Sequence, residues 1–220
     1  CGPERPGFQR RGKPRPVIRG RANARPHFRA RPGRARLQAE RRRRAGMTDA
    51  ERCGVVGYLG HDPELLSDSI RNNILLGSDD DAWKYLRAVC LEDEVKAMPN
   101  GLDTRVGDGG VRLSGGQQQR LALARTLAHP RPLLVLDDPF SALDRKTEEQ
   151  VFDNLRKMTA GSTVLLISHR LYLFPQMDGV LWIQDGKAVC AAHEELIVQN
   201  PQYAALVNAQ EGGEQDEPEK

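Results

Sequence analysis

The fold is decided by residues 113–144, LSGGQQQRLALARTLAHPRPLLVLDDPFSALD. Residues 117–128 are predicted to form a helix, which Pro130 and Pro132 end. The apolar run 133–136 follows as a short buried strand, and two aspartates come directly after it. This order predicts a helix that leads into a strand with carboxylates at the strand's carboxyl end.

The same alternation of helices and short apolar strands extends on both sides of this stretch. A short strand is predicted at residues 55–59, a second buried run at 163–167 ends in Ser-His, and a hairpin turns at Asp185-Gly186. Helical segments are predicted at 67–98, 146–158 and 194–210. This pattern predicts an α/β fold with a mainly parallel sheet. Ligands of such sheets bind at the carboxyl ends of the strands, where His61, Asp137-Asp138 and His169 are expected.

Charge divides the chain into unequal parts. Residues 1–46 carry fifteen Arg and one Lys against two Glu, a net charge of +14. Because the whole chain is +3, residues 47–220 carry −11. We expect residues 1–46 to be disordered and foreign to the fold, 47–210 to form the domain, and 211–220 to be a disordered acidic tail. The acidic domain does not suit nucleic acid, so no nucleic-acid partner is expected.

The sequence contains few features that indicate a cellular compartment or insertion into a membrane. No apolar run approaches the roughly 20 residues that span a bilayer, and the Arg-rich start has no apolar region typical of a secretory signal. The four cysteines, at positions 1, 53, 90 and 190, form no C-x-x-C pair and are interpreted as reduced thiols of a cytosolic protein. Membrane association would then come through another chain or another segment.

Two groups of residues suit phosphate chemistry. Gly115 and Gly116 let a backbone approach a phosphate closely, and the helix that follows offers free N–H groups to an anion, with Ser114 as an added hydroxyl donor. Asp137 is placed to hold Mg²⁺ through water, and Asp138 to orient or deprotonate an attacking water. Taken singly, these motifs also fit a capped turn and a solvated strand end, and a lone His169 is more often structural.

In this order the motifs closely resemble the ATP-binding cassette (ABC) family over residues 47–210. The resemblance implies a P-loop NTPase-like fold, incomplete at its N-terminus, with a helical subdomain that carries the signature motif. It matches the following positions: Leu113, Ser114, Gly115, Gly116 and Gln117 to the signature, Asp137 to the Walker B aspartate, Asp138 to the catalytic Glu, Ser141, Ala142, Leu143 and Asp144 to the D-loop, His169 to the switch histidine, 57–74 to the Q-loop region of exporters, and 104–110 to the segment facing their coupling helices.

The sequence departs from the family pattern in three ways. The 220 residues contain no G-x-x-x-x-G-K-[ST] phosphate loop. His61 stands where the family has the Q-loop Gln; an imidazole can still bind a metal or water, so His61 is kept with Asp137 as a candidate Mg²⁺ site. Asp138 replaces Glu and is one methylene shorter. The last two changes resemble the degenerate ATP site of heterodimeric exporters.

The resemblance implies an exporter-type ATPase domain that uses ATP and Mg²⁺ at the cytoplasmic face of a membrane. Its expected partners are a transmembrane domain and a second ABC ATPase domain, in a homodimer or heterodimer. The alternatives are a non-catalytic ABC chain that only completes a partner's ATP site, and a soluble ABC ATPase. Residues 1–46 are interpreted as a shifted reading frame of a GC-rich gene; the alternatives are a basic arm for anionic lipid or nucleic acid, and an unrelated or wrongly assembled start.

Overall fold

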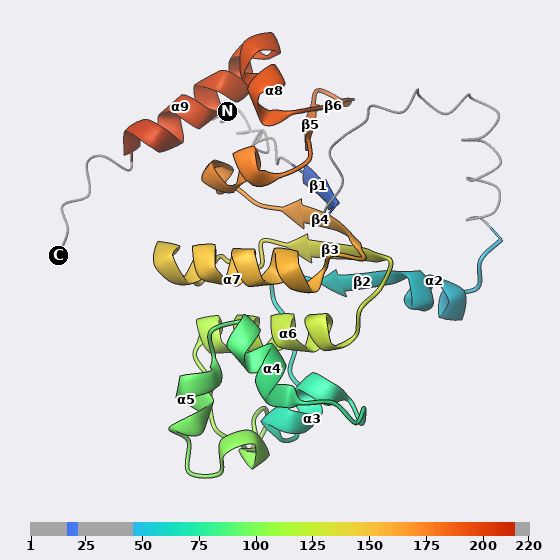
Figure 1. Ribbon diagram of the computed structural model, residues 1–220, viewed down its shortest axis with the longest axis vertical. Coiled ribbons are helices and arrows are strands. Elements are labelled where there is room, and N and C mark those ends of the chain that lie inside the picture. The colour runs from blue at the N-terminus through green and yellow to red at the C-terminus, as the bar shows by residue number, and fades with distance from the viewer. Residues whose placement is uncertain (1–16, 22–45, 214–220) are drawn as a thin grey trace, which may run out of the picture.

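A six-stranded sheet forms the centre of the chain in the computed structural model, which describes residues 17–21 and 46–213 (Figure 1). The strand order is β2-β3-β4-β1-β5-β6. The β2–β3 and β3–β4 pairs are parallel, and the other pairs are antiparallel. The strands span Val17–Arg21 (β1), Val56–Leu59 (β2), Leu133–Asp137 (β3), Thr163–Ile167 (β4), Val180–Gln184 (β5) and Lys187–Ala191 (β6).

The parallel strands β2, β3 and β4 lie beside two long helices, α6 (Gly115–Ala128) and α7 (Arg145–Met158), in Figure 1. Alternate residues of β3 and β4, including Leu134, Leu136 and Leu166, are buried in the core. These strands are short runs of Leu, Val and Ile, which is the composition of strands in parallel sheets. Their carboxyl ends therefore lie at one edge of a rigid scaffold.

A helical subdomain is attached to this scaffold through α6. It comprises α3 (Ile70–Leu75), α4 (Ala82–Ala88), α5 (Glu92–Lys96) and a short 3₁₀ turn, and α6 packs against α3 and α4. Arg125 of α6 donates to the main-chain carbonyl of Asn73 at 2.7 Å and to that of Glu64 at 3.0 Å. These bonds fix the subdomain and the segment after His61 to the last turn of α6.

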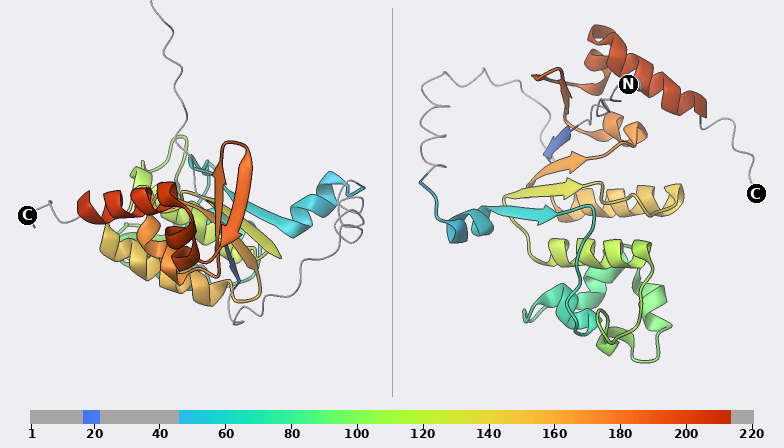
Figure 2. Two further views of the ribbon diagram at one scale, coloured as in Figure 1. Left: turned by 90° about the horizontal axis from the view of Figure 1, so that it is seen from above. Right: turned by 180° about the vertical axis from the view of Figure 1, so that it is seen from behind.

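The C-terminal part packs at the opposite end of the sheet from the helical subdomain, as Figure 2 shows. It contains the predicted β5–β6 hairpin, α8 (His193–Gln199) and α9 (Pro201–Gly213). Trp182 of β5 and Tyr203 of α9 are both buried, and their rings meet edge to face at 5.3 Å. The C-terminal helix extends three residues beyond the predicted end at residue 210.

Strand β1 and helix α2 were not expected from the sequence analysis. Residues 17–21, expected to be disordered within 1–46, form β1 between β4 and β5. Val17 and Ile18 favour strands, and the facing edges of β4 and β5 offer main-chain groups that need partners. The rest of residues 1–46, and residues 214–220 of the expected tail, lie outside the described residues.

The second difference is helix α2 (Asp49–Val55), which precedes β2 and was not predicted. It begins at Thr48, whose hydroxyl accepts from the Glu51 amide at 3.3 Å while the Glu51 carboxylate accepts from the Thr48 amide at 2.7 Å. This Thr-x-x-Glu pair is a capping box and was a readable signal in the sequence. The helix takes Val55 out of the predicted strand, which begins at Val56.

Candidate phosphate-binding site

The carboxyl ends of the three parallel strands bring together the polar residues that the sequence predicted there. Leu59, Asp137 and Ile167 end β2, β3 and β4, and the chain then reaches His61, Asp138 and His169 respectively. The Nδ1 atom of His169 lies 3.1 Å from Oδ2 of Asp138, and Nδ1 of His61 lies 3.8 Å from the same oxygen. Asp138 is therefore the centre of the cluster.

Asp138 is held in an unusual backbone conformation. Its φ is +51°, in the left-handed region that side chains rarely adopt. Its amide donates to the Ile167 carbonyl at 2.7 Å, and its carbonyl accepts from Nε2 of the buried Gln119 at 3.1 Å. These two bonds, from β4 and α6, hold the strained residue in place. Strained residues of this kind are concentrated at functional sites.

The two oxygens of the Asp138 carboxylate have different surroundings. Oδ2 faces the two histidines, whereas Oδ1 is buried and has no hydrogen-bond partner among the described residues. A buried carboxylate oxygen without a partner is unfavourable by about 1–3 kcal/mol. Such an oxygen can accept a hydrogen bond from a water molecule, and the role of Asp138 in orienting an attacking water stays a prediction.

Asp137, the candidate Mg²⁺ ligand, is half-buried at the end of β3. In the described ranges 17–21 and 46–213, no group of three or more His, Cys, Asp or Glu side chains is arranged to hold a metal ion. Mg²⁺ commonly binds through one or two carboxylates, with water and substrate phosphates completing the shell. The acidic pair at β3 fits that mode. The role of His61 as a metal ligand stays a prediction.

The signature residues form the start of α6. Ser114 is the N-cap: its hydroxyl oxygen accepts from the Gln117 amide at 3.2 Å, and the Gln117 side-chain oxygen accepts from the Ser114 amide at 2.8 Å. Gln117 also donates from Nε2 to Glu94 of α5 at 2.7 Å. The Gln117 side chain is thus used inside the chain. Gly115 and Gly116 lie in the first turn of α6, where main-chain amides have no partner within the helix.

The two signature glycines have different surroundings. A Cβ at Gly116 would lie 2.9 Å from the carbonyl oxygen of Ala142, whereas a Cβ at Gly115 would meet none of the described residues within 4 Å. Gly116 is therefore needed because the D-loop passes directly over the first turn of α6. Packing within ranges 17–21 and 46–213 does not require a glycine at position 115.

The D-loop, residues 141–144, is a turn that leads into α7. The Ser141 amide donates to the Asp138 carbonyl at 3.3 Å, and the Leu143 amide to the Phe140 carbonyl at 3.0 Å. Asp144 caps α7 by accepting from the Thr147 amide at 3.0 Å, and this bond lowers the pKa of Asp144. The loop therefore connects the Asp138 cluster with the start of α6.

Sequence reasoning missed three side chains that support this site. Gln119 holds the Asp138 carbonyl, while Arg170 and the buried Glu148 pair beneath the D-loop. Burial raises the pKa of Glu148, against the opposing effects of Tyr172 and Arg170. The polar Gln119 within a buried helix face was a usable signal. Nothing in the local pattern connected Glu148 with Arg170, because 22 positions separate them.

Comparison with known proteins agrees with this geometry. The family model described as "ABC transporter" matches residues 27–141, slightly more than half of the chain. The chain belongs to the ABC transporter family. The match begins before Met47, and the domain boundary at residue 47 stays a prediction.

Several relatives are transporters. The chain is 41% identical over 155 residues to the "ATP-dependent lipid A-core flippase" of Paraburkholderia xenovorans (strain LB400), covering 69% of this chain and 26% of the flippase. It is 40% identical over 162 residues to "P-glycoprotein 14" of Caenorhabditis elegans, covering 71% of this chain and 12% of that protein. The chain thus matches only part of each relative's length, 26% of the flippase and 12% of P-glycoprotein 14.

A solved structure gives the same fold. The bacterial Atm1-family ABC exporter with ATP bound superposes with a TM-score of 0.70 at 25% identity, over 89% of this chain and 42% of that one. The predicted α/β fold class is confirmed. Within the described residues, no helix is long and apolar enough to cross a membrane.

Proposed function

We propose that this chain is the ATP-binding domain of an exporter-type ABC transporter and that it acts in a head-to-tail pair with a second such domain. In this proposal the pair couples ATP binding and hydrolysis to transport through a transmembrane domain, at the cytoplasmic face of the membrane. The observation that carries it is the D-loop, which joins the Asp138 cluster on one side to the start of α6 on the other. The exporter relatives support the same assignment.

Each residue has a stated task in this proposal. Bound Mg²⁺–ATP supplies the phosphoryl group that water attacks. Asp137 holds Mg²⁺ through water, and Oδ1 of Asp138 orients the attacking water. His169 bonds Asp138 through Nδ1, so Nε2 is the ring nitrogen that remains for the γ-phosphate. His61, on the same carboxylate oxygen, takes the place of the Q-loop Gln.

We further propose that the chain contributes most to the partner's ATP site. Ser114 and the amides of Gly115 and Gly116 are preorganised to face a phosphate, because the capping box and Glu94 already fix Gln117. The chain's own site has the shorter Asp138 and no phosphate loop in these 220 residues. A misplacement of about 1 Å in a catalytic group can lower the rate about a hundredfold.

ATP-dependent pairing tests this proposal. The chain would be mixed with an exporter ATP-binding domain that has an intact phosphate loop but a disabled catalytic carboxylate, and association would be followed by sedimentation with and without Mg²⁺–ATP. Gly115→Asp adds a side chain and a negative charge where none of the described residues opposes them, so it should abolish pairing.

Gly161→Asp is the matched control, because a Cβ at Gly161 also meets nothing within 4 Å and Gly161 lies between α7 and β4. It adds the same charge away from α6 and should leave pairing intact. Pairing that ignores ATP, or that survives Gly115→Asp, would contradict the proposal.

A further inference from the structure

Arg170 makes contacts that no feature of the phosphate chemistry requires. It follows His169 directly, and its guanidinium reaches back beneath the D-loop. Nη2 donates to the Leu143 carbonyl at 3.2 Å and to the Ser141 carbonyl at 3.5 Å, while Nη1 bonds the Glu148 carboxylate. One side chain therefore holds two D-loop carbonyls and the first part of α7.

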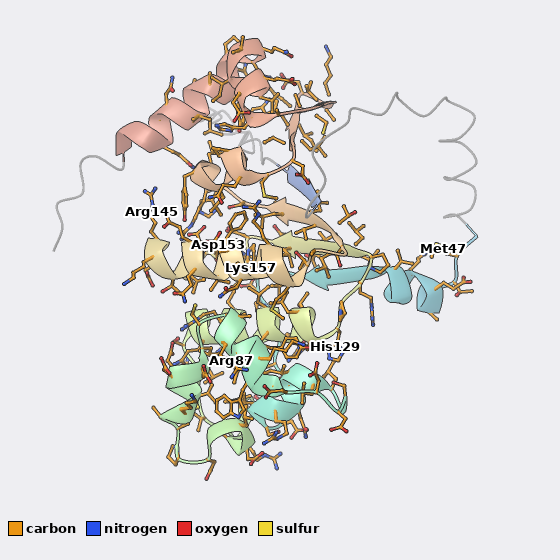
Figure 3. The ribbon with its side chains drawn as sticks, viewed as in Figure 1. Met47, Arg87, His129, Arg145, Asp153 and Lys157 are labelled. Carbon is orange, nitrogen blue, oxygen red and sulfur yellow. The ribbon has the colours of Figure 1, made fainter. Side chains whose placement is uncertain are left out.

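The position of this guanidinium is fixed by its surroundings. The Glu148 side chain is 0% exposed, and Arg170 is the charged group that it pairs with. The Arg170 amide also donates to the Ser168 hydroxyl at 3.0 Å, which fixes the main chain beside His169. One turn before Glu148, the guanidinium of Arg145, the first residue of α7, lies 4.5 Å from the centre of the Tyr172 ring, and Figure 3 labels Arg145 on that helix.

The planar geometry of the guanidinium suits a side chain that bonds two D-loop carbonyls and a carboxylate at once. Arg presents several donors in a rigid planar fork, and Lys presents one compact ammonium on a flexible stem. An ammonium at position 170 could pair with Glu148 or reach a carbonyl, but it could not reproduce the same fork. The D-loop contacts should therefore depend on Arg itself and not only on a positive charge.

We propose that Arg170 is a positioning residue that links the switch histidine to the D-loop, and through the D-loop to the start of α6. His169 contacts Asp138 at 3.1 Å, and the Ala142 carbonyl lies against Gly116. Any displacement of the segment that carries His169 then moves the loop that covers the signature. The link from His169 to the D-loop through Arg170 lies within this chain. Its effect on ATP hydrolysis rests on the proposed function.

Hydrogen–deuterium exchange of the full 220-residue chain tests the link without any ligand. Arg170→Lys should speed exchange of the D-loop amides of Ser141 and Leu143 by about tenfold or more, since bonds to a charged donor are lost and the loop opens locally. Exchange in β3 and β4 should stay unchanged. Arg156→Lys is the control: Arg156 lies on α7, is exposed, and bonds Gln176 at 3.4 Å, away from the D-loop.

Unchanged D-loop exchange in Arg170→Lys would overturn the proposal. Equal acceleration across the whole chain would also overturn it, because that result indicates a purely structural ion pair. If Arg170→Lys does not fold, Glu148→Gln takes its place, since it keeps the side-chain shape and removes the charge that holds the guanidinium. Faster exchange confined to the D-loop then supports the proposal, and unchanged exchange overturns it.

A second readout addresses the reaction. In a pair reconstituted with an exporter ATP-binding domain whose phosphate loop and catalytic carboxylate are intact, Arg170→Lys should lower kcat severalfold and leave KM for ATP unchanged, because Arg170 positions a loop and does not touch the nucleotide. A raised KM with unchanged kcat would contradict the positioning role. If the unaltered pair shows no ATP hydrolysis, the proposed function fails, and the exchange experiment alone decides on the link.

Discussion

The contact between α6 and the D-loop gives the sharpest prediction about this fold. A Cβ placed on Gly116 would lie 2.9 Å from the Ala142 carbonyl oxygen, and backbone atoms cannot give way as a flexible side chain can. Overpacking of this kind destabilises by about 1–3 kcal/mol. Gly115→Ala meets nothing within 4 Å and should stabilise by about 0.4–1 kcal/mol, because it restricts the unfolded chain.

The two variants should therefore differ in free energy of unfolding by about 1.4–4 kcal/mol, with Gly116→Ala the less stable. For a domain of 150–250 residues, 1 kcal/mol corresponds to about 2–4 °C in Tm, so the melting temperatures should differ by about 3–16 °C. Calorimetry of the isolated chain and urea unfolding measure both quantities. Equal stability of the two variants would refute the close approach of the D-loop to α6.

Three further predictions concern ligand binding, acid stability and β1. The 220-residue chain alone should show no micromolar ATP affinity in calorimetry and negligible phosphate release; steady Mg²⁺-dependent turnover that Asp137→Ala abolishes would contradict this. The cap bond to Thr147 lowers the pKa of Asp144 below its ordinary 3.8, so its stabilisation is present above about pH 3.8 and is lost as the pH falls through the lowered pKa. At neutral pH, Asp144→Ala should lower the free energy of unfolding by about 1 kcal/mol and Asp144→Asn should not; equal urea midpoints for the two would count against the cap. Deleting residues 1–21 removes β1 from between β4 and β5 and should lower the melting temperature by several degrees; an unchanged value would show that the strand is dispensable.

Much of the fold could be predicted from the sequence because the apolar runs and the residues that bound them indicated the same elements. The apolar runs that became β3 and β4 are bounded by prolines, aspartates and Ser-His, and the Asp185-Gly186 turn marked the hairpin. The parallel arrangement then placed His61, Asp138 and His169 at one edge, and their measured separations agree with that expectation. In each case a short pattern determined the structure of its own segment.

The remaining features depend on partners distant in sequence. β1 forms because β4 and β5 leave an opening between them, which no property of residues 17–21 could reveal. Likewise, Arg170 and Glu148 pair only after α7 and β4 have packed, and the left-handed φ of Asp138 is imposed by bonds from Ile167 and Gln119. Tertiary contacts, and not local propensity, determine these features.

The roles of the two sides of the chain can be separated by ATP hydrolysis in a pair reconstituted with an exporter ATP-binding domain that keeps both its phosphate loop and its catalytic carboxylate. Gly115 faces outward from the start of α6, and Asp138 belongs to the chain's own cluster. We predict that Gly115→Asp lowers the pair's kcat about a hundredfold, as expected when phosphate-facing donors are blocked, and that Asp138→Asn changes it less than about twofold. The assay is steady-state phosphate release by the pair with each variant. Turnover that Asp138→Asn abolishes and Gly115→Asp leaves intact would contradict the account.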